Sequence, residues 1–402
     1  MSSRAPLRFQ PCDYACFLVY TTYAWCAFCI PNVLGPLTEE LHFAINDGNA
    51  ALAGTLALWR GGFVLLSMTV CGFIAGRWGK RHSLAIATVL VGGGILFGAT
   101  ANCYTTLVAA IVVSSIGQGF FEGLLTPLVN ENHRAEQDAA RYVNITHSFW
   151  AVGSISIMLL AGFLLQHGVS WRIVLSLVGF ATIFPGAFFF RQRRQDQLFQ
   201  SEVRNFHQTW EQVRKALGRM RFWLFLAAMP LASGVEHSLL FWMPTYLQTR
   251  WIVGPAAAGV GTALFAAGMF VGRFLAGLLG HQNSTGKILA CCATTLLAAS
   301  LVALNATSLW LFMATLFLLG VATGPLWPGL QNHCVNRLQA LDQTTMLILL
   351  PTAGAAGFGV FPWLLGFLTD KFGNTGSFYL LPTCAIALLF LLGIDWTIHD
   401  KT

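Results

Sequence analysis

Long apolar runs alternate with short polar breaks along nearly the whole chain. Each run holds about 20 mostly apolar residues or more, the length that an α-helix needs to cross the hydrocarbon core of a bilayer. The pattern predicts twelve membrane-spanning helices, at residues 14–37, 51–75, 83–103, 107–130, 141–166, 171–190, 222–247, 257–280, 286–304, 307–330, 343–369 and 376–396.

One long polar stretch, residues 191–221, divides these runs into six and six. It predicts an N-terminal six-helix bundle over 1–190, a linker over 191–221 and a C-terminal six-helix bundle over 222–402. Both halves share a spacing: Gly119 precedes Pro127 by eight residues, and Gly320 precedes Pro328 by eight, at an offset of 201 residues. Duplicated halves are typical of secondary transporters whose site lies where the halves meet. We therefore expect an all-α membrane protein of two pseudo-symmetric bundles.

Composition supports a membrane location. Of the 402 residues, 55% are hydrophobic and 10% are charged, whereas a soluble domain carries about 25% charged residues. The first apolar run is too long for a signal-peptide core, so we expect it to remain as the first helix.

The distribution of Lys and Arg predicts the orientation. If the N-terminus is cytoplasmic, 18 of the 23 basic residues fall on the inner side, three on the outer side and two inside the runs. Basic residues concentrate in cytoplasmic loops. We therefore expect a multi-pass protein of the cell inner membrane with both termini in the cytoplasm. The net charge of +7 is then a consequence of topology, and nucleic acid is not an expected partner.

Two loop segments resemble a known family. After the second run, residues 72–81 read Gly-Phe-Ile-Ala-Gly-Arg-Trp-Gly-Lys-Arg, which resembles the signature of the major facilitator superfamily between helices two and three. Gly76 stands where that signature has Asp. A degenerate copy, from Gly272 to Gly280, follows in the second half. The resemblance implies alternating access, with helices one, four, seven and ten lining a central cavity.

Within that superfamily, two further segments look like the fucose-permease branch of proton-coupled sugar porters. They are Gly117–Gly153, with its Glu, Pro, Asn and His, and Gly234–Tyr246. The resemblance implies that Glu122 matches the branch's buried helix-four Glu and that Asn144 matches its helix-five Asn. The branch's acidic residue in helix one has no counterpart between Tyr14 and Leu37.

Four charged residues lie well inside the predicted spans: Arg60, Glu122, Glu236 and Arg273. Such residues cost about 2.5–3.5 kcal/mol each at mid-helix, so they usually line a cavity or pair with one another. Glu122 and Glu236 fall on helices four and seven, where a carboxyl can load and release a proton as access alternates. The alternative is that Arg60 and Arg273 neutralise them and the four merely hold helices together.

The remaining candidates carry weaker signals. His147 is a possible proton relay or a packing histidine. Trp327, beside Pro328, and Asn32, beside Pro31, are candidate substrate contacts, as are Asn144 and Arg273. His237 is expected to face a neighbouring helix rather than the cavity. Arg60 has the fixed donor fork that binds carboxylate or phosphate, which favours an anionic substrate instead of a sugar.

These observations predict a secondary active transporter, with proton-coupled symport of a small polar solute such as a sugar as the first hypothesis. An organic-anion symporter or uniporter that uses Arg60 is the alternative, and a non-transporting membrane sensor of the same fold is the second alternative. The chain has no GxxxxGK[ST] nucleotide loop, and its His and Cys residues show no metal-ligand spacing. We expect no enzymatic activity, cofactor or metal, and a monomer whose partners are its solute, protons and lipid.

Overall fold

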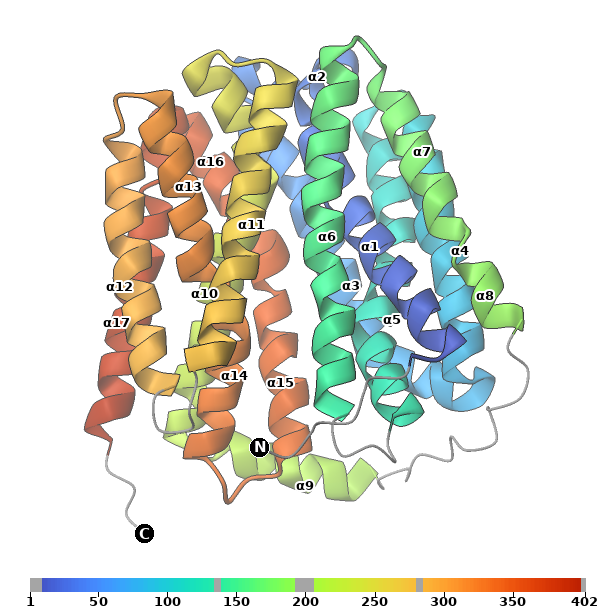
Figure 1. Ribbon diagram of the computed structural model, residues 1–402, viewed down its shortest axis with the longest axis vertical. Helices are drawn as coiled ribbons and strands as arrows, with labels where there is room; N and C mark the ends of the chain where they lie inside the picture. Colours follow the sequence, from blue (N-terminus) through green and yellow to red (C-terminus); the bar gives the residue numbers. More distant parts are fainter. Residues whose placement is uncertain (1–8, 134–138, 192–205, 280–284, 399–402) are drawn as a thin grey trace.

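The computed structural model describes residues 9–133, 139–191, 206–279 and 285–398. These residues form helices and contain no strand. Twelve of the helical segments are long and apolar enough to cross a membrane. The predicted fold class is therefore confirmed, and Figure 1 shows the helices standing side by side in one elongated bundle.

The first half begins with the helices α1 and α2 and ends at α8. Its elements are α1 (Pro11–Asn32), α2 (Leu34–Glu40), the short 3₁₀ helix η1 (Ile45–Asp47), α3 (Ala50–Trp78), α4 (Lys80–Ala99), α5 (Tyr104–Asn132), α6 (Ala139–Gln166), α7 (Trp171–Ile183) and α8 (Gly186–Arg191). The second half contains α9 (Phe206–Leu217), α10 (Met220–Trp251), α11 (Pro255–Leu279), α12 (Thr285–Leu304), α13 (Leu309–Thr323), α14 (Leu326–Arg337), α15 (Gln343–Ala355), α16 (Gly357–Ser377) and α17 (Leu380–Thr397).

Four predicted spans are each divided in two. Three divisions lie at or just after a proline: Pro31 precedes the break between α1 and α2, Pro185 separates α7 from α8, and Pro325 separates α13 from α14. Proline has no amide hydrogen and cannot close the helical ladder. The fourth division, at Ala356, lies among glycines. The apolar pattern extended across these breaks because hydropathy does not register a missing donor.

The helix repeat predicted from Gly119 and Gly320 is visible in the packing. A Cβ atom on Gly119 would collide with the Val64 carbonyl oxygen of α3, and one on Gly320 would collide with the Phe265 carbonyl oxygen of α11. Both members of this contact recur at the same offset of 201 residues. The two halves are therefore built on one helix-packing plan, with glycine allowing close backbone approach.

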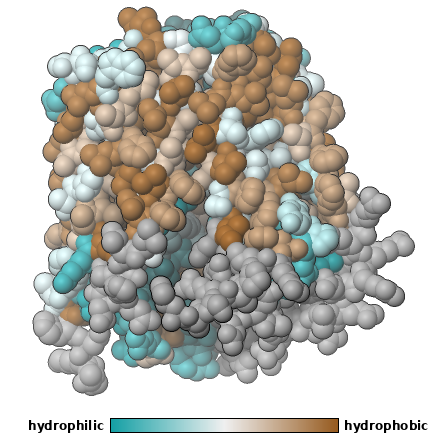
Figure 2. Space-filling view, viewed as in Figure 1, coloured by the Kyte–Doolittle hydropathy of each residue, from teal (hydrophilic) through white to brown (hydrophobic). Residues whose placement is uncertain are grey.

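Two faces of the bundle serve as reference points. The α9 face is the one at which α1 begins, α17 ends and α9 lies; the α2 face is the opposite one, where α2 lies (Figure 1). Between them the outer surface is apolar, with exposed residues such as Phe163, Phe180 and Phe390. Figure 2 shows this apolar covering on one side of the molecule, with hydrophilic residues gathered toward the two ends. Such a surface is suited to lipid.

The two halves meet closely in the part of the bundle nearer the α2 face. There α3 packs against α16, where a Cβ on Gly61 would lie 2.8 Å from the backbone nitrogen of Gly359. In the same region α6 packs against α11, with Gly162 against the Pro255 carbonyl oxygen. A carboxylate also crosses between the halves: Asp370 of α16 accepts hydrogen bonds from the backbone amides of Ala50 (2.9 Å) and Ala51 (2.8 Å) at the start of α3. The α2 side of the interface is thus closed.

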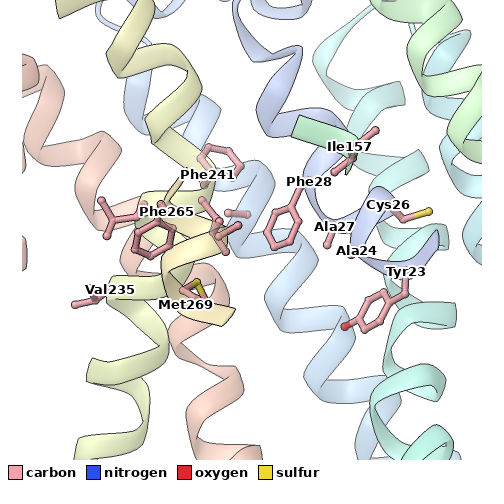
Figure 3. Close-up of a cluster of buried hydrophobic side chains, with 14 of the residues drawn as sticks. Tyr23, Ala24, Cys26, Ala27, Phe28, Ile157, Val235, Phe241, Phe265 and Met269 are labelled. Carbon is pink, nitrogen blue, oxygen red and sulfur yellow. The ribbon is translucent and has the colours of Figure 1, made fainter. Parts of the chain in front are cut away.

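Aromatic side chains fill the middle of this interface. Figure 3 shows Phe28 of α1 near the centre of the cluster, with Phe241 of α10 and Phe265 and Met269 of α11 together on one side of it. These four side chains are buried. Two of them, Phe28 and Phe241, also line the central cavity described below.

Candidate functional site

A cavity lies between the halves and contains about 510 Å³ of unfilled space. Its walls come from α1, α3, α4, α5, α10 and α16, so both halves contribute. Most of the lining is apolar or aromatic, and the polar lining residues are Arg60, Ser114, Gln118 and His237. An apolar cavity with a few convergent polar groups is the usual form of a small-molecule site.

Arg60 is held by a short chain of hydrogen bonds. Its Nε donates to Oε1 of Gln118 at 2.8 Å, and Nε2 of Gln118 donates to Oγ of Ser114 at 3.0 Å. Gln118 and Ser114 are both buried. Among the described residues, no carboxylate lies within the 4.0 Å ion-pair distance of Arg60. The guanidinium is therefore positioned but not neutralised.

Glu122 lies one helical turn from Gln118 on α5. Its side chain is exposed, although α5 packs against α3, α4, α6 and α1 inside the first half. Oε1 accepts a 2.7 Å hydrogen bond from the hydroxyl of the buried Tyr23. The expected alternative, neutralisation of Glu122 by an ion pair with Arg60, is not formed.

Glu236 has a different environment. It is buried on α10, and Oε2 lies 3.4 Å from Nη2 of Arg273 on α11. The Nε of Arg273 donates to the carbonyl oxygen of Gly324 at 3.0 Å. In a continuous helix that oxygen would accept the amide of residue 328, but Pro328 has no amide hydrogen. Arg273 thus replaces the missing donor at the break between α13 and α14 and pairs with Glu236 at the same time.

His147 lies on α6 and is exposed. Its Nε2 is 2.9 Å from the Thr126 hydroxyl of α5 and 3.2 Å from the Tyr20 hydroxyl of α1. The ring therefore joins three helices of the first half, α1, α5 and α6.

The other candidate contacts are placed less directly. Asn32 is buried, and its side-chain amide donates to the Phe28 carbonyl oxygen at 2.8 Å, so it completes the end of its own helix. Trp327 is half-buried beside Gly354 and next to the Phe358 ring, 5.7 Å away. Neither side chain is part of the cavity wall. Asn144 lies on α6, and its side chain is outside the described part of the structure.

Three cavity residues escaped prediction. His237 was expected to face a neighbouring helix; it does stack on Phe358 of α16, with ring centroids 4.1 Å apart, but it also lines the cavity. Gln118 and Ser114 are uncharged, so a search for intramembrane charges passes over them. A signal was present, since Ser114, Gln118 and Glu122 are spaced four residues apart and must share one face of a helix.

The described residues can be compared with the ligand sets that metal ions require. No group of three or more His, Cys, Asp and Glu side chains among residues 9–133, 139–191, 206–279 and 285–398 is arranged to hold a metal ion. The polar groups that line this cavity are the guanidinium of Arg60, the amide of Gln118, the hydroxyl of Ser114 and the imidazole of His237.

Two helical halves around a largely apolar central cavity with a few polar groups are typical of a membrane transporter. The chain belongs to the Major Facilitator Superfamily, whose family model matches residues 16–251 and 251–397. This agrees with the resemblance seen in the loop after the second apolar run.

Two relatives have similar sequences. The chain is 24% identical over 430 aligned positions to "Putative glycerol-3-phosphate transporter 5" of Arabidopsis thaliana, covering 90% of this chain and 85% of that protein. It is 28% identical over 180 positions to "Glucose-6-phosphate exchanger SLC37A1" of Homo sapiens, covering 42% of this chain and 34% of that protein.

Solved structures share the fold. The xylose transporter XylE from E. coli superposes with a TM-score of 0.72 at 11% identity, covering 97% of each chain. A bacterial homologue of the human lysosomal transporter Spinster gives 0.73 at 14% identity and 97% of each chain. The nucleoside transporter NupG gives 0.73 at 12% identity, over 97% of this chain and 99% of that one.

Proposed function

We propose that this protein is a secondary active transporter that carries a small polar solute together with protons by alternating access. The observation that carries the proposal is Glu122: a carboxylate in the middle of the helix bundle whose side chain is exposed and whose recorded partner is the neutral Tyr23 hydroxyl. An intramembrane acid in this position is expected to have a function, because an unpaired charge among apolar helices is costly.

The closed and open ends of the interface support alternating access. Close contacts between the halves lie toward the α2 face, whereas Glu122 and His147 are exposed. We therefore propose that, in the conformation described, the central site opens toward the α9 face. The concentration of basic residues favours a cytoplasmic α9 face, which makes this an inward-open state of a cell inner-membrane protein with cytoplasmic termini.

The two acids have unequal roles in this proposal. Glu122 carries the coupled proton, because it is exposed and has no cation at ion-pair distance. Glu236 is buried and paired with Arg273, so it responds to the second half's conformation and exchanges a proton only when that pair opens. His147, beside Tyr20 and Thr126, offers a relay between Glu122 and the α9 face.

Two substrate classes have specific support. A neutral sugar is favoured by the resemblance to the fucose-permease branch. A carboxylate such as Glu122 can accept hydrogen bonds from sugar hydroxyl groups. An organic anion is favoured by Arg60, which lines the cavity without a carboxylate partner. The names of both relatives refer to phosphate esters of polyols or sugars, which combine the two classes.

The test is uptake into proteoliposomes containing the purified protein, with the outside buffer more acidic than the lumen. Labelled glucose, glucuronate, glucose 6-phosphate and glycerol 3-phosphate are compared. Proton symport predicts that at least one solute accumulates above its external concentration and that a protonophore abolishes the excess. Uptake that stops at equilibrium whatever the pH gradient would indicate a uniporter or exchanger, and no uptake of any solute would favour a sensor.

A further inference from the structure

The guanidinium of Arg60 has one edge engaged and one edge available. Its Nε donates to Gln118 on α5, and no hydrogen bond or ion pair is recorded for its two Nη groups among the described residues. The residue lines the central cavity. A cation inside a membrane bundle with no carboxylate at ion-pair distance is expensive, so this arrangement suits a ligand that brings an anionic group to the free edge.

We infer that Arg60 is an oriented clamp for an oxyanion of the transported solute, a carboxylate or a phosphate monoester, and that Gln118 is the residue that orients it. This deepens the proposed function and rests on it for the claim that the bound solute is then transported. The Nη edge of a guanidinium matches two oxygens of one carboxylate or phosphate group, which gives both strength and direction to the bond.

The orientation of Gln118 follows from its partners. A guanidinium has donors only, so the amide must present its oxygen to Arg60. The Gln118 amide nitrogen then donates to the Ser114 hydroxyl oxygen at 3.0 Å. Because Gln118 and Ser114 are buried on one face of α5, the amide is fixed by the helix, and Arg60 is fixed by the amide.

A neutral glutamine is essential to this device. A glutamate at position 118 would hold Arg60 equally well, but it would also neutralise the positive charge that attracts the solute. The chain places its acid, Glu122, one turn further along α5, where it bonds to Tyr23 rather than to Arg60. A proton on Glu122 removes the nearest negative charge from the clamp, so proton loading and anion binding favour one another, which is the thermodynamic requirement for symport.

The cavity walls restrict the body of the solute. Phe28 and Phe241 line the space beside Arg60, and Figure 3 shows Phe28 near the centre of the cluster with Phe241 on one side of it. Arg60 therefore offers a charged group at one side of a space whose other walls near it are aromatic. The aromatic walls supply no counter-charge, so discrimination by charge falls to the clamp.

The experiment is equilibrium binding to the purified full-length protein in detergent, without any gradient, measured by thermal shift and by titration. The probes are matched sets that differ in charge: glucose, glucuronate and glucose 6-phosphate; glycerol and glycerol 3-phosphate; and inorganic phosphate. The variants are Arg60→Gln, Gln118→Glu and Gln118→Met. Gln343→Glu is the control, since it makes the same chemical change at an exposed position at the start of α15.

The clamp predicts that an anionic member of a set binds the wild type and its neutral counterpart does not. Arg60→Gln and Gln118→Glu should each weaken that binding at least about tenfold, which is about 1.4 kcal/mol. Gln118→Met keeps the charge of Arg60 but loses its orientation, so its affinity for the anionic probe should lie between that of these two variants and that of the wild type. The Gln343→Glu control should bind like the wild type.

Three results would overturn the inference: neutral and anionic probes binding alike, an anion binding Arg60→Gln as well as the wild type, or no probe distinguishing the wild type from Arg60→Gln. Carboxylate and phosphate probes separate the two sources of the oxyanion. Because binding needs no proton gradient, failure of the clamp leaves proton coupling intact, and loss of coupling in the transport assay leaves the binding result valid.

Discussion

Single residues decide which charges of this protein are available for chemistry. The four intramembrane charges were recognisable from hydropathy alone, but their partners were not. The sequence-based alternative was that Arg60 and Arg273, or backbone groups, neutralise the two acids; the two possible pairs within one half are Arg60 with Glu122 and Arg273 with Glu236. Only the second pair forms in the structure, because a tyrosine hydroxyl and a glutamine amide take the places of the expected counter-ions in the first half.

Arg273 of α11 holds two neighbouring helices together. It bonds to the Gly324 carbonyl oxygen that Pro328 leaves without a donor, and it pairs with the buried Glu236. We expect Arg273→Leu to destabilise the protein by about 1–3 kcal/mol, because both partners lose their hydrogen bonds. The exposed fraction of the Arg273 side chain, 33%, keeps the loss below that of a fully buried pair.

A double-mutant cycle separates the two contributions. Arg273→Leu, Glu236→Leu and the combined variant are compared by thermal unfolding in detergent. We expect the combined variant to be more stable than the sum of the single effects predicts, by about 1 kcal/mol or more, because removing Glu236 relieves its unpaired burial. Additive effects would mean that the contact between Arg273 and Glu236 contributes nothing.

The limit of sequence reasoning at this scale is physical. Hydropathy identifies a charge as out of place, and helical spacing identifies neighbours on one helix, such as Gln118 and Glu122. Contacts between helices depend on rotation and depth, which the pattern does not specify. Tyr23 could therefore not be assigned to Glu122, nor Gln118 to Arg60, before the helices were placed.

At the scale of elements, a network on the α2 face joins three helix ends. Glu40, at the end of α2, accepts hydrogen bonds from the Trp171 indole at 2.6 Å and from Arg172 at 3.1 and 2.8 Å. Arg172 also donates to the carbonyl oxygens of Ala99 and Ala101, after α4. In the sequence, Arg172 was simply one of three basic residues assigned to the outer side; the structure adds its function as a connector.

This network predicts a pH dependence. Hydrogen bonds from Arg172, and then from Trp171, lower the pKa of Glu40 below its ordinary value. A lowered folded-state pKa means that the stabilisation is complete above the unfolded pKa of about 4.3 and is lost as the pH falls through the folded value. We expect Glu40→Gln to reduce the free energy of unfolding at pH 7 by about 1 kcal/mol or less, as for other solvent-exposed ion pairs.

Thermal unfolding of the wild type and Glu40→Gln at pH 7 and pH 3 checks this. The difference between the two proteins should shrink at the lower pH. Glu39→Gln is the matched control, because Glu39 is exposed, lies next to Glu40 and has no recorded ion pair among the described residues. A difference that is the same at both pH values would contradict the assigned role.

Helices were predicted more reliably than their interruptions. The number of spans, their order and the central division all followed from apolar length. The breaks after Pro31 and at Pro185 and Pro325 carried a proline signal, whereas α5 continues through Pro127. Pro328, which matches Pro127 at the offset of 201 residues, lies in the first turn of α14 just after a break that α5 lacks, since the surrounding packing decides whether a helix bends or ends.

At the scale of the whole molecule, the two halves are joined most closely on the α2 side. Glycines allow α3 and α16 to approach closely, and Asp370 bonds to the amides that begin α3. The repeat was foreseeable from the sequence, but the conformational state was not, because one chain must be compatible with both open ends. Small residues and a few polar contacts at the closed end suit an interface that separates in the cycle we propose.

The central claim is that Glu122 carries the proton that drives solute through this cycle. The most direct measurement compares the wild type with Glu122→Gln in proteoliposomes, by accumulation under an inward proton gradient and by counterflow exchange without a gradient. The variant imitates a permanently protonated acid, so accumulation should disappear while exchange persists at a comparable rate. Undiminished, gradient-dependent accumulation by Glu122→Gln would contradict the claim and assign the coupling to another group.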